Sequence, residues 1–300
     1  MMISNKIAFV FPAFITEFTS KELYFLQRNN LSLSSYIEKV SEVLKYDLPD
    51  FTYDNSEYWN SEFLSQILAY IFSCSISDVL VNKDIKPSFV AGYSMGIYAA
   101  LYSIGAISFI DGINIIKKAF NLTNDLRESG KYGMGAIIGL TVDDVNMLIK
   151  KNKLTTEIIN INNEHSAVVA GKKSEINELL LEAKNEGAIS TTVLTVNTPY
   201  HSEYMLKYTD VFTSFVDTLQ LKDPICPLIS TFNQREITKE AELKKELVFN
   251  LTRKINWFKT MRKVIEKNAS DFYECGAGKD LKKISRFIDG DYNMKLIHKL

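Results

Sequence analysis

The 300-residue sequence is poor in cysteine, tryptophan, proline and histidine. Its cysteines, Cys74, Cys226 and Cys275, are widely spaced and form no CxxC pair, which argues against a disulfide framework or a zinc site. We therefore expect reduced thiols, a cytoplasmic location and no bound metal or cofactor. The 35 basic residues are balanced by 36 acidic ones, so the chain lacks the electrostatic footprint of a protein that binds nucleic acid or an anionic membrane.

Long apolar runs are also missing. No uninterrupted run reaches the roughly 18 residues of a membrane-spanning helix, so we expect no membrane segment. The start, MMISNKIAFVFPAF, lacks a basic region followed by a small-residue cleavage site, which favours a first strand over a signal peptide. With 46% hydrophobic residues, the chain can bury the core of one large domain carrying a smaller insertion.

The first 130 residues have the pattern of an α/β domain. Residues 7–11 are continuously apolar and end at Pro12, as in a strand buried on both faces of a parallel sheet. Apolar spacing predicts a helix at about 61–73, and Pro87 precedes a short strand, SFVAG. Two helices should follow, one over 95–104 and one that begins near Ser108 or Asp111.

The segment from about residue 130 to 196 has a different pattern. Its alternating patterns predict the order βαββαβ, a ferredoxin-like arrangement, with Thr141 and Ser174 as helix N-caps. We interpret it as a small subdomain, residues 129–197, inserted into a large α/β domain formed by residues 1–128 and 198–300.

The sequence VAGYSMGIYAA contains the pattern GxSxG around Ser94. It follows a predicted strand and opens a predicted helix, which is the setting of a nucleophile elbow. Gly92 and Gly96 would allow the close approach of strand and helix that such a turn requires. The backbone amide of Met95, at the start of that helix, would then be one donor of an oxyanion hole.

A serine nucleophile needs a base, and the chain has three histidines. His165 falls in a predicted turn of the small subdomain, and His298 is the third residue from the end of the sequence. His201 stands where the chain re-enters the large domain, beside Pro199, a position suited to a cleft between subdomains. We therefore predict His201 as the base.

In order along the chain, FVFPAF, GYSMGIYAALYSIGAISFIDGINII, AVVAG, NTPYHSEYM, INWFKTM and YECGAGKDL resemble segments of the malonyl-CoA:acyl-carrier-protein transacylases and polyketide synthase acyltransferases. The resemblance covers nearly the whole chain. It implies an α/β-hydrolase-like large domain with a parallel sheet, a ferredoxin-like small subdomain, and ping-pong transfer of an acyl group through Ser94 and His201. The substrates would carry phosphopantetheine, as acyl-CoA or acyl carrier protein.

The same resemblance assigns further roles. The backbone carbonyl of Asn250 would orient His201, and the backbone amide of Phe14 would be the second oxyanion donor. Tyr93, Ile97, Ala119 and Tyr200 would line the acyl pocket. Lys279 or Lys282 could meet an acidic carrier protein, although a lysine there is ordinarily only a solvated surface charge.

The chain departs from the family where extender carboxylates are bound. Members that load malonyl groups carry an arginine 25 residues after the serine, and here that position is Ala119. Lys117 and Lys118 are adjacent but face other sides of a helix, and Arg127 lies two turns further on. A buried carboxylate without its partner loses about 2 to 5 kcal/mol, so we hypothesise an uncharged acyl group.

Four alternatives stay open. The chain could be a thioester hydrolase that edits a polyketide assembly line, or a malonyl transacylase that uses another cation. A serine esterase would need His298 as base, with Asp289 or Asp291 as its acid. A carrier-protein docking module with a vestigial site is the non-catalytic alternative.

Overall fold

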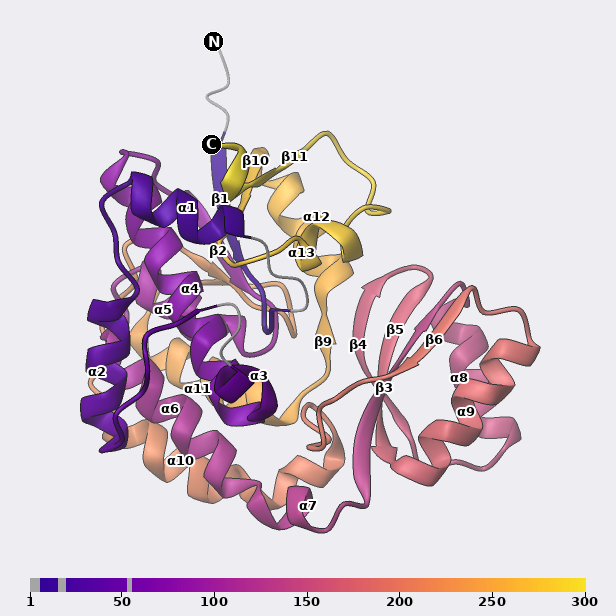
Figure 1. Cartoon of the computed structure of the whole chain (residues 1–300). Helices are drawn as coiled ribbons and strands as arrows, with labels where there is room; N and C mark the ends of the chain where they lie inside the picture. Colours follow the sequence, from indigo (N-terminus) through magenta and orange to yellow (C-terminus); the bar gives the residue numbers. More distant parts are fainter. Residues whose placement is uncertain (1–5, 16–19, 53–55) are drawn as a thin grey trace.

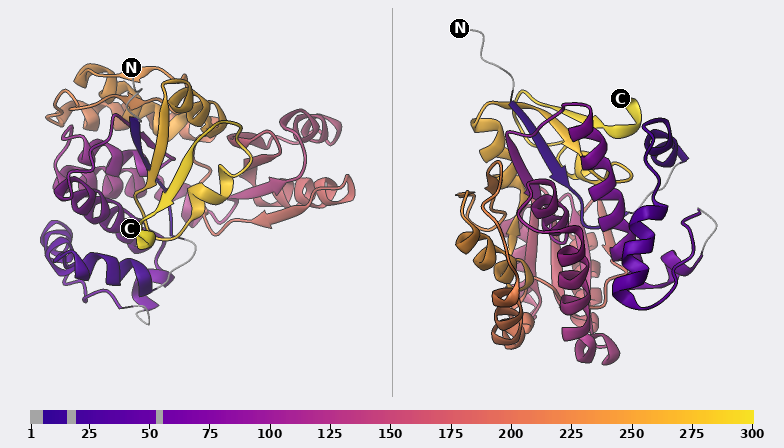
Figure 2. Two further views of the ribbon diagram at one scale, coloured as in Figure 1. Left: turned by 90° about the horizontal axis from the view of Figure 1, so that it is seen from above. Right: turned by 90° about the vertical axis from the view of Figure 1, so that its left-hand side faces the viewer.

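The computed structural model describes residues 6–15, 20–52 and 56–300. Figures 1 and 2 show two lobes: a large one around a six-stranded sheet, and a smaller one that projects from its side. The first half of the large lobe contains β1 (Lys6–Phe11), α1 (Ser20–Arg28), α2 (Ser34–Leu44), α3 (Ser56–Asn60), α4 (Glu62–Asn82), β2 (Phe89–Gly92), α5 (Gly96–Ser103), α6 (Phe109–Leu122) and α7 (Asn124–Glu128).

The chain then builds the smaller lobe and returns. The smaller lobe contains β3 (Tyr132–Ile138), α8 (Val142–Lys151), β4 (Glu157–Asn163), β5 (Ser166–Lys172), α9 (Lys173–Asn185) and β6 (Ser190–Val193). The remaining elements are η1 (Glu203–Tyr208), α10 (Thr209–Thr218), β7 (Leu228–Ile229), β8 (Glu236–Ile237), α11 (Glu240–Thr252), β9 (Ile255–Asn256), α12 (Trp257–Glu266), β10 (Ala269–Glu274), α13 (Asp280–Ile284), β11 (Asn293–Leu296) and η2 (Ile297–Lys299).

The large sheet has the strand order β11-β10-β1-β2-β7-β8. Its pairs are parallel except for β7 with β8, which confirms the predicted α/β class. Alternate residues of β1 enter different cores: Phe9 and Phe11 pack with α1, α2 and α4 to α6, whereas Ala8 and Val10 pack with α12 and α13. Helices therefore cover both faces, which is why β1 is apolar throughout.

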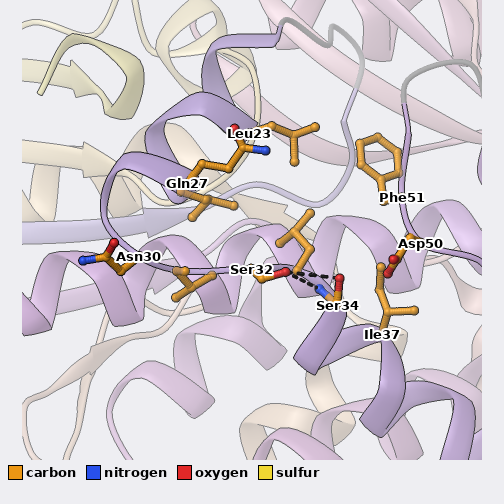
Figure 3. A pocket seen from close by; sticks show the side chains of 11 residues that line it. Leu23, Gln27, Asn30, Ser32, Ser34, Ile37, Asp50 and Phe51 are labelled. Carbon is orange, nitrogen blue, oxygen red and sulfur yellow. Dashed lines mark hydrogen bonds between the residues drawn. The ribbon is translucent and has the colours of Figure 1, made fainter.

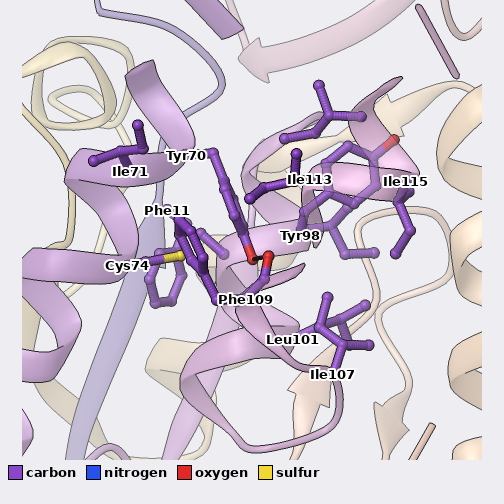
Figure 4. Packing of buried hydrophobic residues seen from close by; sticks show 14 of the residues in the cluster. Phe11, Tyr70, Ile71, Cys74, Tyr98, Leu101, Ile107, Phe109, Ile113 and Ile115 are labelled. Carbon is purple, nitrogen blue, oxygen red and sulfur yellow. Dashed lines mark hydrogen bonds between the residues drawn. The ribbon is translucent and has the colours of Figure 1, made fainter. Parts of the chain in front are cut away.

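Helix α4 runs through the larger core and is longer than the sequence pattern predicted, since it ends at Asn82. By length and composition alone it could cross a membrane, but 78% of its most apolar window is buried inside the protein. Figure 4 shows Tyr70 of this helix stacked on Phe109, with ring centroids 5.1 Å apart. The Tyr70 hydroxyl also donates to the Phe109 carbonyl oxygen, so α4 is fixed against the start of α6.

The small sheet has the order β6-β3-β5-β4-β9. The predicted βαββαβ order is confirmed, and β3 to β6 are antiparallel throughout. Helices α8 and α9 cover one face. Strand β9 adds a parallel edge from residues assigned by prediction to the large domain, so the predicted domain limits remain a proposal.

The two predicted caps of this region have different outcomes. Thr141 caps α8 as predicted, in a reciprocal capping box with Asp144. Ser174 is not a cap, because β5 leads directly into α9 and Lys172 occupies the cap position. The extended backbone of Lys172 makes the turn, and its amine pairs with Glu175 at 2.9 Å.

Candidate active site

Ser94 lies on a sharp turn between β2 and α5, as the elbow pattern predicted. Its φ is +53°, in the left-handed region that a residue with a Cβ rarely adopts. A Cβ on Gly92 would lie 2.3 Å from the Ile97 backbone, and one on Gly96 would lie 2.1 Å from the Phe11 carbonyl oxygen. The two glycines are therefore required by the close approach of α5 to β2 and β1.

His201 lies in the loop that follows β6, and its ring reaches Ser94. The distance between Ser94 Oγ and His201 Nε2 is 2.7 Å. His201 also has a positive φ, +65°, and its amide donates to the Leu251 carbonyl oxygen at 3.1 Å. The side chain is buried, and this burial lowers the pKa of His201 to about 4. The imidazole is therefore neutral at pH 7 and can accept the serine proton at Nε2.

The resemblance implied that the backbone carbonyl of Asn250 orients the other ring nitrogen of His201, Nδ1. Nδ1 is buried and makes no hydrogen bond of ordinary geometry within the described residues. A looser contact with the backbone of Arg253, three positions after Asn250, raises the pKa of His201 against the larger effect of burial. The structure therefore gives no orienting bond from the Asn250 backbone, whose carbonyl remains a proposed partner.

A small cavity of about 30 Å³ opens beside these two residues. Its wall is formed by Phe14, Gln66, Ser94, Met95, Tyr98, Ile116, Ala119, Tyr200, His201, Asn250 and Leu251. None of the described residues that form this wall is a lysine or an arginine. Phe14 and Met95, the two predicted oxyanion donors, belong to it, but their role remains a prediction.

The four predicted acyl-pocket residues separate into two pairs. Ala119 and Tyr200 line the cavity. Ile97 faces the larger core, and Tyr93 turns away to the small sheet, so neither forms part of the wall. The residue after an elbow glycine points into the sheet-helix packing, which is why Ile97 is 2% exposed.

Sequence reasoning missed several cavity residues. Tyr98 could have been found, because it lies in the first turn of α5, directly after the elbow that carries Ser94. Gln66 and Ile116 could not, because they come from α4 and α6, and only tertiary packing brings these helices to the serine. Gln66 is 4% exposed, so its amide is enclosed beside the site.

Two of the candidate cations, Arg127 and Lys118, have other partners. The Arg127 guanidinium donates to the Phe120 carbonyl oxygen and to the side chains of Thr123 and Asn124, and it stacks on the Phe120 ring. The Lys118 amine lies over the ring of Phe215. Arg127 is thus folded back on the end of α6 and is not part of the cavity wall.

The remaining predicted candidates lie elsewhere. His165 is exposed in the β4–β5 turn, as expected. His298 lies in η2 and approaches Glu22 at 3.8 Å, while Asp289 and Asp291 are exposed, so the triad of a serine esterase is not assembled. The Lys282 amine donates to the Met294 carbonyl oxygen at 2.8 Å.

A larger cavity of about 390 Å³ lies between α1 and α2 (Figure 3). Its wall contains no histidine or cysteine, and the Ser32 and Ser34 hydroxyls are 3.1 Å apart in a bond to each other. None of its lining residues can act as a base toward these hydroxyls except the carboxylate of Asp50. The chemistry is therefore concentrated in the smaller cavity.

Comparisons with known proteins agree with this geometry. The model of the acyl transferase domain family matches residues 64–270. A malonyl CoA-acyl carrier protein transacylase of Bacillus subtilis is 28% identical over 295 residues, which cover 94% of this chain and 91% of the relative. One from Staphylococcus aureus is 26% identical, covering 92% and 90%.

Solved structures share the fold. The malonyl CoA-acyl carrier protein transacylase of Coxiella burnetii superposes with a TM-score of 0.88 at 23% identity, covering 98% of this chain and 94% of that one. A malonyl-transacylase in complex with a type II polyketide synthase acyl-carrier protein gives 0.86 at 22% identity, covering 97% and 96%. The chain therefore belongs to the acyl transferase domain family and is an acyltransferase.

Proposed function

We propose that this protein is an acyl-carrier-protein S-acyltransferase that transfers an uncharged acyl group through an acyl-Ser94 intermediate. The bond between Ser94 Oγ and His201 Nε2 supports the nucleophile and its base. The names of the relatives, and the carrier protein bound to one structural neighbour, support thioesters of CoA and acyl carrier protein as the substrates. We expect the protein to be cytoplasmic, to hold no cofactor or metal, and to bind neither nucleic acid nor a membrane.

In the first half-reaction, Ser94 Oγ attacks the carbonyl carbon of the acyl thioester. His201 Nε2 takes the hydroxyl proton as the new C–O bond forms. The backbone amides of Met95 and Phe14 would stabilise the oxyanion, and one such donor is worth about 3 kcal/mol. When the C–S bond breaks, His201 returns the proton to the sulfur, and CoA or carrier protein leaves as a thiol.

The second half-reaction is the reverse with a new acceptor. The phosphopantetheine thiol of an acyl carrier protein gives its proton to His201 Nε2 and attacks the acyl-Ser94 ester. The C–O bond breaks, the new thioester forms, and the proton returns to Ser94 Oγ. The buried imidazole is neutral before each half-reaction, which suits this exchange.

The composition of the cavity wall carries the proposal of an uncharged acyl group. A malonyl carboxylate buried beside Ser94 would need a cation, and the part of the wall that the structure describes contains none. Ala119 stands at the position where the resemblance implies an arginine. Arg127 is the nearest alternative in sequence, but its guanidinium bonds to the end of α6.

Transfer to water instead of a thiol is the second candidate, since the same Ser94 and His201 would hydrolyse the acyl-enzyme. The cavity favours neither acceptor. A malonyl transacylase would require Arg127 to leave the Phe120 carbonyl oxygen and the Thr123 hydroxyl. We therefore favour transfer or hydrolysis of an uncharged acyl group over malonyl transfer.

Intact-mass spectrometry after exposure to acetyl-, butyryl- and malonyl-CoA tests the proposal. We expect an acyl adduct from a neutral thioester in the wild type and none in the matched Ser94→Ala variant. Adding holo acyl carrier protein then shows whether the acyl group reaches the thiol or is lost to water. An adduct from malonyl-CoA alone would overturn the uncharged acyl group.

A further inference from the structure

Tyr93, directly before the nucleophile, sends its side chain out of the elbow and into the small sheet. Its hydroxyl donates to Asn162 Oδ1 at 2.8 Å and accepts from Asn160 Nδ2 at 2.8 Å. Both asparagines belong to β4 and are 5% exposed. One phenol thus joins the strand-helix turn of the large lobe to a central part of the smaller lobe.

The rest of Tyr93 is held just as firmly. Its amide donates to the Phe11 carbonyl oxygen at 2.9 Å, and its ring meets the edge of Trp257 with centroids 5.5 Å apart. Trp257 is in turn fixed by a hydrogen bond from Nε1 to Ser285 Oγ. The position of the Tyr93 hydroxyl is therefore determined by β1 and α12, and β4 must adapt to it.

The contact needs a group that donates and accepts at the same time. Burial raises the pKa of Tyr93 to about 12, so the phenol keeps its proton at neutral pH. The Asn160 side chain bonds to Tyr93 alone among the described residues, and its Oδ1 has no partner. A phenylalanine at position 93 would leave a buried amide donor and a buried carbonyl oxygen without partners, and the polar pair would be expected to separate.

We propose that Tyr93 is a positioning residue that holds β4 against the nucleophile elbow and thereby keeps Ser94 Oγ aligned with His201 Nε2. This rests on the proposed role of Ser94. The elbow needs such support because Ser94 has a positive φ, which persists only where surrounding contacts enforce it. The chain that leads to His201 leaves the small sheet at β6, so a shift of that sheet is passed to the base and to Tyr200. A displacement of about 1 Å costs roughly 100-fold in rate.

The test measures how fast Ser94 reacts in Tyr93→Phe, Tyr93→His and the wild type. A fluorophosphonate probe labels any activated serine, so this readout does not depend on knowing the acyl substrate. Acylation by the best neutral acyl-CoA gives kcat and KM. Tyr36→Phe is the matched control, because it removes a hydroxyl that donates to Asp78 on α4, away from the cavity.

We expect Tyr93→Phe to label about 10- to 100-fold more slowly with full final amplitude, and to lower kcat with KM within about twofold. Tyr93→His should recover most of the rate, because a neutral imidazole also donates and accepts. A lower amplitude at an unchanged rate constant would mean partial misfolding, and would overturn the proposal. Equal rates for Tyr93→Phe and wild type, or for Tyr93→His and Tyr93→Phe, would overturn it too. A wild type that labels but takes no acyl group would instead refute the proposed function.

Discussion

The two sheets of this protein bury different kinds of residue. The large sheet is covered on both faces, and its first strand is apolar throughout, with Phe9 and Phe11 on one face and Ala8 and Val10 on the other. The small sheet has an apolar face under α8 and α9, whereas its other face is mixed: an apolar cluster that includes Met134 and Val168 lies there beside the buried asparagines of β4 that meet the elbow. The first sheet thus places the nucleophile, and the second supplies a polar support and the chain that leads to the base.

This division predicts that removing either partner of the Ser94–His201 pair has the largest effect. Ser94→Ala should abolish the acyl adduct, and His201→Ala should slow acylation by about 1,000-fold or more, because His201 is the base bonded to Ser94 Oγ among the described residues. Rapid-quench mass spectrometry measures both. His165→Ala is the matched control, since His165 is exposed on the smaller lobe, and its rate should stay within about twofold of wild type. A His201→Ala variant that acylates at the normal rate would refute the assignment of the base.

Ala119→Arg tests the apolar wall contributed by the large lobe. Ala119 is 6% exposed and lines the cavity, so a guanidinium there could meet a carboxylate. The ratio of malonyl to acetyl acylation should rise by roughly 10- to 1,000-fold, measured as kcat/KM for each thioester. Ala119→Leu fills the same space without charge and should raise no such preference. An equal rise in both variants would show that size, not charge, determines the selection.

Gly96 in the large lobe and Gly135 in the smaller one differ in what surrounds them. In Gly96→Ala the new Cβ would lie 2.1 Å from the Phe11 carbonyl oxygen, and the backbone cannot yield without moving β1. In Gly135→Ala of the small sheet, the neighbours are Ile176 and Leu180 side chains at 3.0 and 3.2 Å, which can rotate. We expect a cost of more than about 2 kcal/mol for the first and less than about 1 kcal/mol for the second, from urea unfolding. Equal costs would contradict this difference.

The sequence predicts those features whose cause is local. The elbow follows from Gly92, Ser94 and Gly96, and the βαββαβ order follows from hydrophobic spacing; both agree with the structure. The scarcity of histidine pointed to His201, whose Nε2 lies 2.7 Å from Ser94 Oγ, although its role as the base remains a proposal. The elbow and the βαββαβ order agree with the structure because one stretch of chain determines each.

The predictions that failed have a different cause: they depend on contacts between segments that are far apart in the sequence. Gln66 reaches the cavity only because α4 packs beside α5, and Tyr93 leaves it because Asn160 and Asn162 take its hydroxyl. Ser174 has the composition of a cap, but β5 continues to Lys172 and leaves it inside the helix. The spacing of residues within one segment cannot predict such contacts between segments.

The pH dependence of acylation tests how deeply His201 is enclosed between the lobes. Burial lowers its pKa to about 4, so the neutral base persists down to that pH. The acylation rate constant should therefore stay level from pH 8 to about 5 and fall only near pH 4, whereas an exposed histidine would lose half its activity near its ordinary pKa of about 6.5. Stopped-flow acylation across this range measures it. A midpoint above pH 6 would show that the site is open to water.

The lowered pKa of His201 also determines whether the free energy of unfolding rises or falls with pH. Above about pH 6.5 neither the folded nor the unfolded His201 binds a proton, so the group does not alter stability. Between about pH 6.5 and 4 the unfolded histidine takes up a proton and the folded one does not, so the free energy of unfolding falls as the pH falls. His201→Gln should remove this part of the pH dependence.

The smallest expected effects are those of two helix N-cap substitutions, one in each lobe, and they test whether the two lobes unfold together. Ser108 caps α6 in the large lobe, and Thr141 caps α8 in the smaller one, each in a reciprocal capping box. Replacing either with alanine should cost about 1 kcal/mol, because each hydroxyl satisfies an amide of the first helical turn. Ser174→Ala is the control within the smaller lobe, and it should cost less than about 0.5 kcal/mol because Ser174 caps nothing.

Hydrogen exchange measures which backbone amides lose protection in each variant. If the smaller lobe opens by itself, Thr141→Ala should speed exchange about fivefold in β3 to β5 and leave α4 unchanged, whereas Ser108→Ala should act on α4 and α6. If the Tyr93 contact joins the lobes into one unfolding unit, both substitutions should lower protection everywhere by the same factor. The second pattern is expected in the wild type, because separating the lobes would break both hydrogen bonds of the Tyr93 hydroxyl and expose the apolar cluster in which Met134 and Val168 pack with Phe14 and Tyr200. Tyr93→Phe should convert it to the first.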